Sequence, residues 1–100
     1  MTRTCVALPI AADHPAFAGH FPGRPIVPGV VLLDETLHAI GASTGIELAR
    51  CTIASAKFLS PVSPGESVAL CFEAAANNSL RFELSSGERI VATGSIRLQE

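Results

Sequence analysis

Residues 19–29, GHFPGRPIVPG, are the most informative stretch of this chain of 100 residues. They place a titratable imidazole, that of His20, in a backbone with little freedom. Each proline of the stretch fixes its own φ and pushes the preceding residue towards extended geometry. The prolines are Pro22, Pro25 and Pro28. We therefore predict a stiff loop that holds His20 in one place.

An apolar run follows this loop, and we predict that residues 30–42 form a helix. Gly29 then lies at the helix N-terminus, where the first four backbone N–H groups lack helical partners and the dipole is positive. Such an end can polarise a carbonyl group. Asp34 follows about 7.5 Å further along the helix axis. Apolar residues occupy nearly every side of the run, which indicates a buried helix.

The rest of the chain is predicted to be mainly β-strand. Apolar residues alternate with period two after the helix, and Pro-Gly, Asn-Asn and Ser-Ser-Gly sequences separate the alternating segments as turns. One helix with a run of antiparallel strands is an α+β architecture. The strands are expected within residues 3–10, 46–60, 66–74, 80–84 and 90–98, and residues 11–28 form a long loop.

The loop and the helix start resemble the signature of the 3-hydroxyacyl-acyl carrier protein dehydratases of the hot-dog fold. That signature reads His-Phe-Pro-x-x-Pro, two further residues, Pro-Gly-Val, and then an acidic residue on the helix. The chain matches it from His20 to Val30 throughout, and Asp34 occupies the acidic position. The resemblance implies one hot-dog domain over residues 1–100, an antiparallel sheet wrapped around one long central helix. It is a short form, without the family's usual helix before the first strand.

The resemblance implies dehydration of a (3R)-hydroxyacyl thioester to a trans-2-enoyl thioester. His20, which titrates near neutrality, suits the base that takes a proton from the carbon next to the carbonyl. Asp34 suits the acid that protonates the departing hydroxyl, and its place in an apolar helix predicts burial, which favours the protonated form. The N–H of Gly29 suits the thioester oxygen. In the family the base and acid come from opposite subunits, and a backbone carbonyl, here that of Ile26, orients the imidazole.

Two residues depart from the family pattern. The acid is Asp34, whereas plain dehydratases usually carry Glu, and Asp is typical of relatives that also isomerise the double bond. One turn later, His38 stands where the family usually has a Gln that hydrogen-bonds to the acid. Asp34 and His38 share one helix face because they are four residues apart. His38 is therefore either the orienting partner of Asp34 or a satisfied core histidine.

Other residues of the motif are candidates for holding the substrate and its carrier. Phe21 is expected to line an apolar acyl channel, with core filling as the alternative, and Pro28 and Val30 flank the glycine at the helix start. The substrate implied is carried by an acidic acyl carrier protein. Arg24 and Lys57 are candidate docking cations, with ordinary solvated charge as the alternative reading.

The composition indicates a homo-oligomer. Hydrophobic residues make up 48% of the chain and charged residues only 16%, against about 25% charged in typical domains. A small chain needs more polar surface to cover its core, so part of its apolar surface is expected to be buried against another copy.

The net charge of −2 offers no electrostatic case for binding nucleic acid. The apolar segments are too short to span a membrane and the start lacks a signal peptide, so we expect a cytoplasmic protein.

Three cysteines, Cys5, Cys51 and Cys71, are widely spaced and include no Cys-x-x-Cys pair. We therefore expect buried free thiols in strands, with neither a disulfide framework nor a zinc site. The histidines match no standard metal spacing, and the chemistry needs no metal. No cofactor is expected.

Two other functions remain open at this point. A hot-dog acyl thioesterase would use Asp34 or Glu35 to activate water, but it leaves the proline-enclosed His20 unexplained. A non-catalytic acyl-binding or carrier-binding module is the second alternative. The acyl chain length and the pathway are also open, either general fatty acid synthesis or, as the short form slightly favours, a specialised product such as a polyene.

Overall fold

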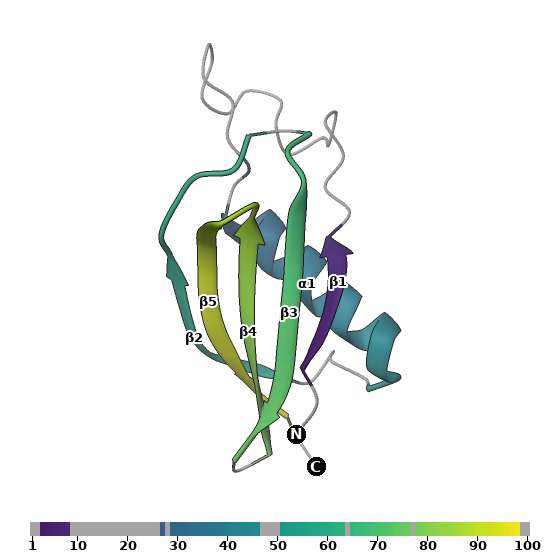
Figure 1. Ribbon diagram of the computed structural model, residues 1–100. Coiled ribbons are helices and arrows are strands. Elements are labelled where there is room, and N and C mark those ends of the chain that lie inside the picture. The colour runs from purple at the N-terminus through teal and green to yellow at the C-terminus, as the bar shows by residue number, and fades with distance from the viewer. Residues whose placement is uncertain are drawn as a thin grey trace.

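The computed structural model describes residues 3–8, 27, 29–46, 51–63, 65–76 and 78–98, which form one sheet and one helix (Figure 1). This is the α+β arrangement expected for the hot-dog fold. Among these residues no helix is long and apolar enough to cross a membrane. In chain order the elements are β1 (Thr4–Leu8), α1 (Gly29–Thr44), β2 (Thr52–Phe58), β3 (Val68–Ala75), β4 (Ser79–Ser86) and β5 (Arg89–Arg97).

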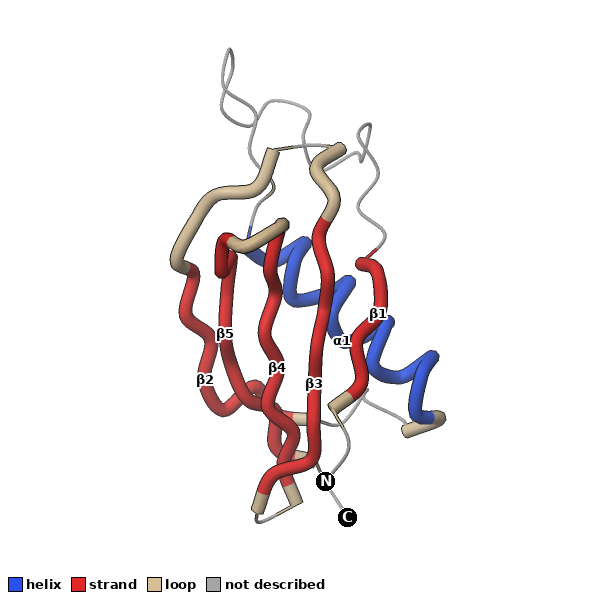
Figure 2. The backbone as a smooth tube through the Cα atoms, in the orientation of Figure 1, coloured by secondary structure: helices blue, strands red, loops and turns tan. Residues whose placement is uncertain are grey.

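The five strands lie in the order β1-β3-β4-β5-β2, and every neighbouring pair is antiparallel. β1 and β2 are therefore the two edges, and α1 crosses one face of the sheet (Figures 1 and 2). The strands follow the prediction in number and order. The strand expected within residues 46–60 is shorter, since β2 spans only Thr52–Phe58 and residues 47–50 lie outside the described part.

The core lies between α1 and the facing side of the sheet. The period-two prediction for β3 and β4 is confirmed, because the alternating apolar residues are buried while their neighbours are more exposed. Gly94 of β5 lies under the ring of Phe82, and a Cβ there would approach Phe82 Cζ to 2.5 Å. The buried alternating residues are Val68, Leu70 and Phe72 of β3, and Leu80, Phe82 and Leu84 of β4.

The helix is buried along one side only, so the prediction of a helix buried all round is wrong for the described chain. Leu32, Thr36 and Ile40 are four residues apart and form the buried stripe. The Thr36 hydroxyl donates to the Leu32 carbonyl at 2.7 Å, which satisfies a buried polar group within the helix itself. Val30 is 73% exposed. The helix ends at Thr44, and Gly45 follows with φ +77°, a left-handed stop that suits glycine.

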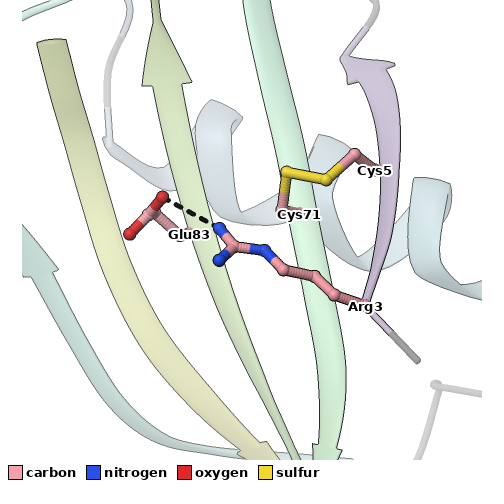
Figure 3. A network of polar contacts seen from close by, with 4 residues as sticks. All are labelled: Arg3, Cys5, Cys71 and Glu83. Atoms are coloured by element: carbon pink, nitrogen blue, oxygen red, sulfur yellow. Dashed lines mark hydrogen bonds and ion pairs between the residues drawn. A yellow bond between two sulfur atoms is a disulfide. The ribbon is translucent and has the colours of Figure 1, made fainter. Parts of the chain in front are cut away.

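The expectation of three free, buried thiols is wrong. Cys5 of β1 and Cys71 of β3 are directly opposite in the antiparallel register and form a disulfide (Figure 3). Cys5 is exposed, and the bond lies beside the ion pair between Arg3 and Glu83. Cys51 is the free thiol. The spacing of the cysteines could not show this pairing, because it depends on which strands become neighbours.

Glu66 holds the connection between β2 and β3. Its carboxylate accepts the Ser63 N–H at 3.0 Å, and its own N–H donates to the Ser63 carbonyl at 3.0 Å. It also pairs with Arg89 at the start of β5. Hydrogen bonds from the Ser86 hydroxyl and the Ser63 amide, together with the charge of Arg89, outweigh burial and lower the pKa of Glu66. Ser63 is thereby linked through Glu66 to the start of β5.

Thiol titration tests the disulfide. Protein purified without reductant and then denatured should show one reactive thiol, that of Cys51, and three thiols after reduction. Because the bond closes a loop with a sequence separation of 66, reduction should lower the free energy of unfolding by up to about 4 kcal/mol. In the Cys51→Ser variant the unreduced protein should show none. Three reactive thiols in the unreduced protein would contradict the pairing.

Candidate active site

The entry of the chain into α1 is held by a backbone hydrogen bond. The Val27 N–H donates to the Val62 carbonyl at 2.7 Å, and both side chains are buried. This bond joins the residue just before the helix to the segment that follows β2. The position of the helix start, where Gly29 lies, therefore depends on a contact between parts of the chain far apart in sequence.

Phe58, at the end of β2, lies against the helix start. A Cβ on Gly29 would lie 2.9 to 3.2 Å from three ring carbons of Phe58, so the ring occupies the space that a side chain would need. Val27, Gly29, Leu32 and Phe58 help to line a hollow of about 320 Å³. The prediction that Gly29 begins the helix is confirmed. Its N–H is one of the first four of the helix, which have no partner within the helix itself and lie at the positive end of the dipole, where such groups can donate to an anion or carbonyl.

Asp34 lies on the open side of α1, opposite the buried stripe. Its side chain is 63% exposed and that of His38 is 74% exposed, so the expected burial of Asp34 is wrong for this chain, and His38 is no core histidine. His38 Nε2 lies 3.8 Å from Asp34 Oδ1. That distance exceeds a hydrogen bond, but a small rotation of either exposed side chain would bring the two within bonding distance.

Asp34 and His38 border an apolar cavity of about 670 Å³ between α1 and the beginning of β2. A cavity of this size lies in the range of small-molecule binding sites. Most of its lining could not be predicted from the sequence, because the approach of β2 to the helix is a tertiary contact without a local signal. The other lining residues are Leu37, Gly41 and Ala42 of α1, Cys51, and Ile53 of β2.

One turn of α1 carries three side chains of the types that bind metal ions: Asp34, Glu35 and His38. One possible ligand atom from each lies within 4.8 Å of the other two. All three come from a single turn of the helix, and Asp34 and His38 are largely exposed. Exposed acidic groups commonly gather in this way without an ion. The expectation that the site uses no metal stays a prediction.

Several predicted site residues lie outside the described residues. They are His20, Phe21, Arg24, Ile26 and Pro28. Of the two expected docking cations, Lys57 lies in β2, whose residues are all exposed. Val30 is exposed beside the helix start. The structure thus brings Gly29, Val30 and Asp34 onto one helix.

These features together define a class of protein. An antiparallel sheet packs on one helix, and that helix begins at Gly29 and carries a carboxyl group beside an apolar cavity. This is a hot-dog protein with a site suited to a substrate that joins a polar reacting end to an apolar chain.

Comparison with known proteins identifies the family. The model of the ApeI-like family, described as ApeI dehydratase, matches residues 1–95. The 3-hydroxyacyl-[acyl-carrier-protein] dehydratase FabZ of Chlamydia trachomatis is 35% identical over 109 residues, which cover 95% of this chain and 71% of that protein. The FabZ of Rhodopseudomonas palustris is 41% identical over 68 residues, 59% of this chain and 45% of that protein. The chain belongs to the ApeI-like dehydratase family.

Two solved structures show the same fold. The dehydratase heterocomplex ApeI:P from Xenorhabdus doucetiae superposes with a TM-score of 0.79 at 25% identity, covering 98% of this chain and 88% of that one. An uncharacterized protein from Erwinia carotovora superposes with a TM-score of 0.77 at 30% identity, covering 97% and 82%. The hot-dog fold predicted from the sequence is confirmed.

The contact between Gly29 and Phe58 can be measured with a double-mutant cycle. Gly29→Ala should lower the free energy of unfolding by about 1 kcal/mol, because the new methyl group displaces the ring. The same substitution in a Phe58→Ala background should cost less or stabilise, since alanine favours the helix and the ring is gone. Denaturant unfolding of the unsubstituted protein, the two single variants and the double variant gives the coupling free energy between Gly29 and Phe58. Equal effects in both backgrounds would show that the ring does not occupy this space.

Proposed function

We propose that this dehydratase removes water from (3R)-hydroxyacyl groups carried as thioesters on an acyl carrier protein, and so forms trans-2-enoyl thioesters. The observation that carries the proposal is the placement of Asp34. It lies on the helix that begins at Gly29, at the border of an apolar cavity. Membership of the ApeI-like dehydratase family supports the reaction, and the FabZ relatives are named for substrates on an acyl carrier protein.

The proposed reaction divides the work among three groups. His20 takes a proton from C2, the C2–C3 double bond forms, and the C3–O bond breaks. Asp34, starting as the carboxylic acid, gives its proton to the departing oxygen, which leaves as water. The Gly29 N–H donates to the thioester oxygen, where negative charge develops. Return of the proton from the His20 imidazolium to Asp34, through water, restores both groups.

His38 is proposed as the residue that orients Asp34. The 3.8 Å separation and the shared helix face support this role. A hydrogen bond between the two side chains would hold the Asp34 carboxyl in one orientation beside the cavity.

The enzyme is proposed to act as a homodimer in which His20 of one chain serves Asp34 of the other. β2 supports this arrangement, because it is a sheet edge whose residues are all exposed and include the apolar Ile53 and Phe58. An exposed apolar edge strand is a template for pairing with another chain. The cavity beside Asp34 is bordered by this same edge. The ApeI:P dehydratase from Xenorhabdus doucetiae is a heterocomplex, so a related second subunit is the alternative partner.

The protein is proposed to act in the cytoplasm, where a structural disulfide is uncommon. Lys57 is exposed at the proposed dimer edge, and Arg24 precedes the helix. Both residues are proposed to bind the acidic acyl carrier protein.

The enzyme is also proposed to isomerise the double bond, because Asp34 stands where plain dehydratases usually carry glutamate. Detection of 3-enoyl product would establish that activity.

Loss of the base is the first test. His20→Ala should lower kcat on a 3-hydroxyacyl thioester by about 10²–10⁴-fold, followed as enoyl absorbance, without a change in the unfolding midpoint. In the unsubstituted protein, release of free thiol in place of enoyl product would identify a thioesterase. If the unsubstituted protein forms neither enoyl product nor free thiol, it is a binding module. Activity of His20→Ala above about a tenth of normal would exclude the assigned role.

Site sharing can be tested by complementation. His20→Ala and Asp34→Asn homodimers should each be nearly inactive, because each site lacks either the base or the acid. After subunit exchange, half of the sites in a mixed dimer lack both groups and half keep both, so activity should reappear. Exchange is verified by native mass spectrometry with two tags. No recovery in verified mixed dimers would place base and acid within one chain.

A further inference from the structure

The first strand, β1, is a short edge strand with few buried side chains. It spans five residues, Thr4–Leu8, and among the described strands it pairs only with β3. Leu8 is buried and Val6 is half-buried, whereas the other three residues are exposed. Terminal segments with so little buried apolar surface are the first parts of a fold to open. Non-covalent contacts alone therefore hold β1 loosely.

The disulfide is the strongest link between β1 and the rest of the sheet. Cys5 and Cys71 are directly opposite each other, so the bond joins the edge strand to its neighbour at matched positions. An ion pair adds a second link, with Arg3 Nη2 at 3.1 Å from Glu83 Oε2, but both side chains are partly exposed. An exposed ion pair contributes little to stability. Reduction of the disulfide therefore removes the main constraint on β1.

The disulfide is placed where a reductant can reach it. Successive side chains of a strand point to opposite faces of the sheet. Because Leu70 and Phe72 are buried in the core beneath α1, Cys71 between them points to the other face. Cys5 is exposed, and Figure 3 shows the bond beside the side chain of Arg3. The proposed dimer uses the opposite edge, β2, so a second copy there leaves Cys5 accessible.

The third cysteine, Cys51, does not compete for this pair in the folded sheet. It comes just before β2, and β2 lies three strand positions away from β3. That separation is roughly 14 Å at about 4.8 Å per strand, whereas thiol–disulfide exchange requires one sulfur to attack another directly. Reoxidation of the folded protein therefore restores the bond between Cys5 and Cys71.

β1 is also connected to the groups of the proposed active site. It lies against α1, the helix that carries Gly29 and Asp34 (Figure 1). In the sequence, the segment that contains His20 joins β1 to α1, and the described residues nearest its two ends, Leu8 and Val27, are both buried. Release of β1 frees one of these ends. Base and acid then lose a contact that fixes their relative positions, on which the rate depends steeply.

We propose that the bond between Cys5 and Cys71 is a reversible redox switch, which fixes β1 when oxidised and releases it when reduced. The oxidised enzyme is then the more active form. A disulfide in a cytoplasmic protein is more often redox-sensing than structural, which agrees with the proposed location. The inference rests on the proposed function only for its effect on activity, since the release of β1 is measured independently.

The switch works by thiol–disulfide exchange. The thiolate of a dithiol protein attacks one sulfur of the bond and forms a mixed disulfide, and its second thiolate then displaces the remaining cysteine. Two electrons and two protons pass to Cys5 and Cys71, and the dithiol becomes a disulfide. The reverse exchange, with a small disulfide such as oxidised glutathione as the oxidant, forms the bond again.

Hydrogen exchange tests the release of β1. Dithiothreitol in native buffer should reduce the bond, and the β1 amides should then exchange at least about tenfold faster while those of β4 and β5 stay protected. Oxidised glutathione should restore slow exchange. Cys5→Ser should behave as the reduced protein in either buffer, and the matched control Cys51→Ser should respond as the unsubstituted protein does.

Three results of this experiment would overturn the proposal. The first is a bond that resists reduction until the protein unfolds. The second is unchanged exchange of the β1 amides after verified reduction. The third is loss of protection throughout β4 and β5 on reduction, because the bond would then be a purely structural cross-link.

Enzyme assays test the effect on activity. The kcat on 3-hydroxyoctanoyl coenzyme A should fall at least about threefold on reduction, because base and acid are less well positioned, and should recover on reoxidation. In Cys5→Ser it should be low and insensitive to the redox buffer. Equal kcat in the two states, with β1 released in one of them, would overturn the regulatory role. If the oxidised protein forms no enoyl product, the proposed reaction fails, and the exchange rates still decide whether the bond controls β1.

Discussion

Helix α1 buries Leu32, Thr36 and Ile40 against one face of the sheet, and this packing sets the rotation of the helix about its axis. Each large apolar side chain buried in this way contributes roughly 1.5–3 kcal/mol. With 3.6 residues per turn, burial of that stripe turns Asp34 and His38 to the opposite, open side. The core and the reacting groups are therefore positioned by a single packing arrangement.

The edge strand β2 lies beside both the start of this helix and the cavity that Asp34 borders. Phe58 lies over the helix start, the segment after it accepts a hydrogen bond from Val27, and Cys51 and Ile53 line the cavity beside Asp34. One side of β2 pairs with β5, and the other side has no strand among the described residues. In the proposed dimer, a second subunit on that edge would lie beside the cavity that Asp34 borders.

Much of the fold was predictable because its signals are local. Alternation identified Leu70, Phe72 and Phe82 as core residues, since a strand repeats with period two whatever its neighbours are. Gly29 was correctly placed at the helix start. The predictions that failed depend on which elements become neighbours in space. The bond between Cys5 and Cys71 requires β1 to pair with β3 in one register, and no spacing between cysteines encodes that choice.

The sequence by itself determined the kind of chemistry. The proline-rich run around His20 and the acid at Asp34 indicated a dehydratase of the hot-dog fold, and the family match agrees. Only the tertiary structure decided which side of α1 is open and which residues line the cavity with Asp34. The reason is physical: a motif fixes residue types and short-range geometry, whereas the cavity forms where β2 approaches the helix, between residues far apart in the chain.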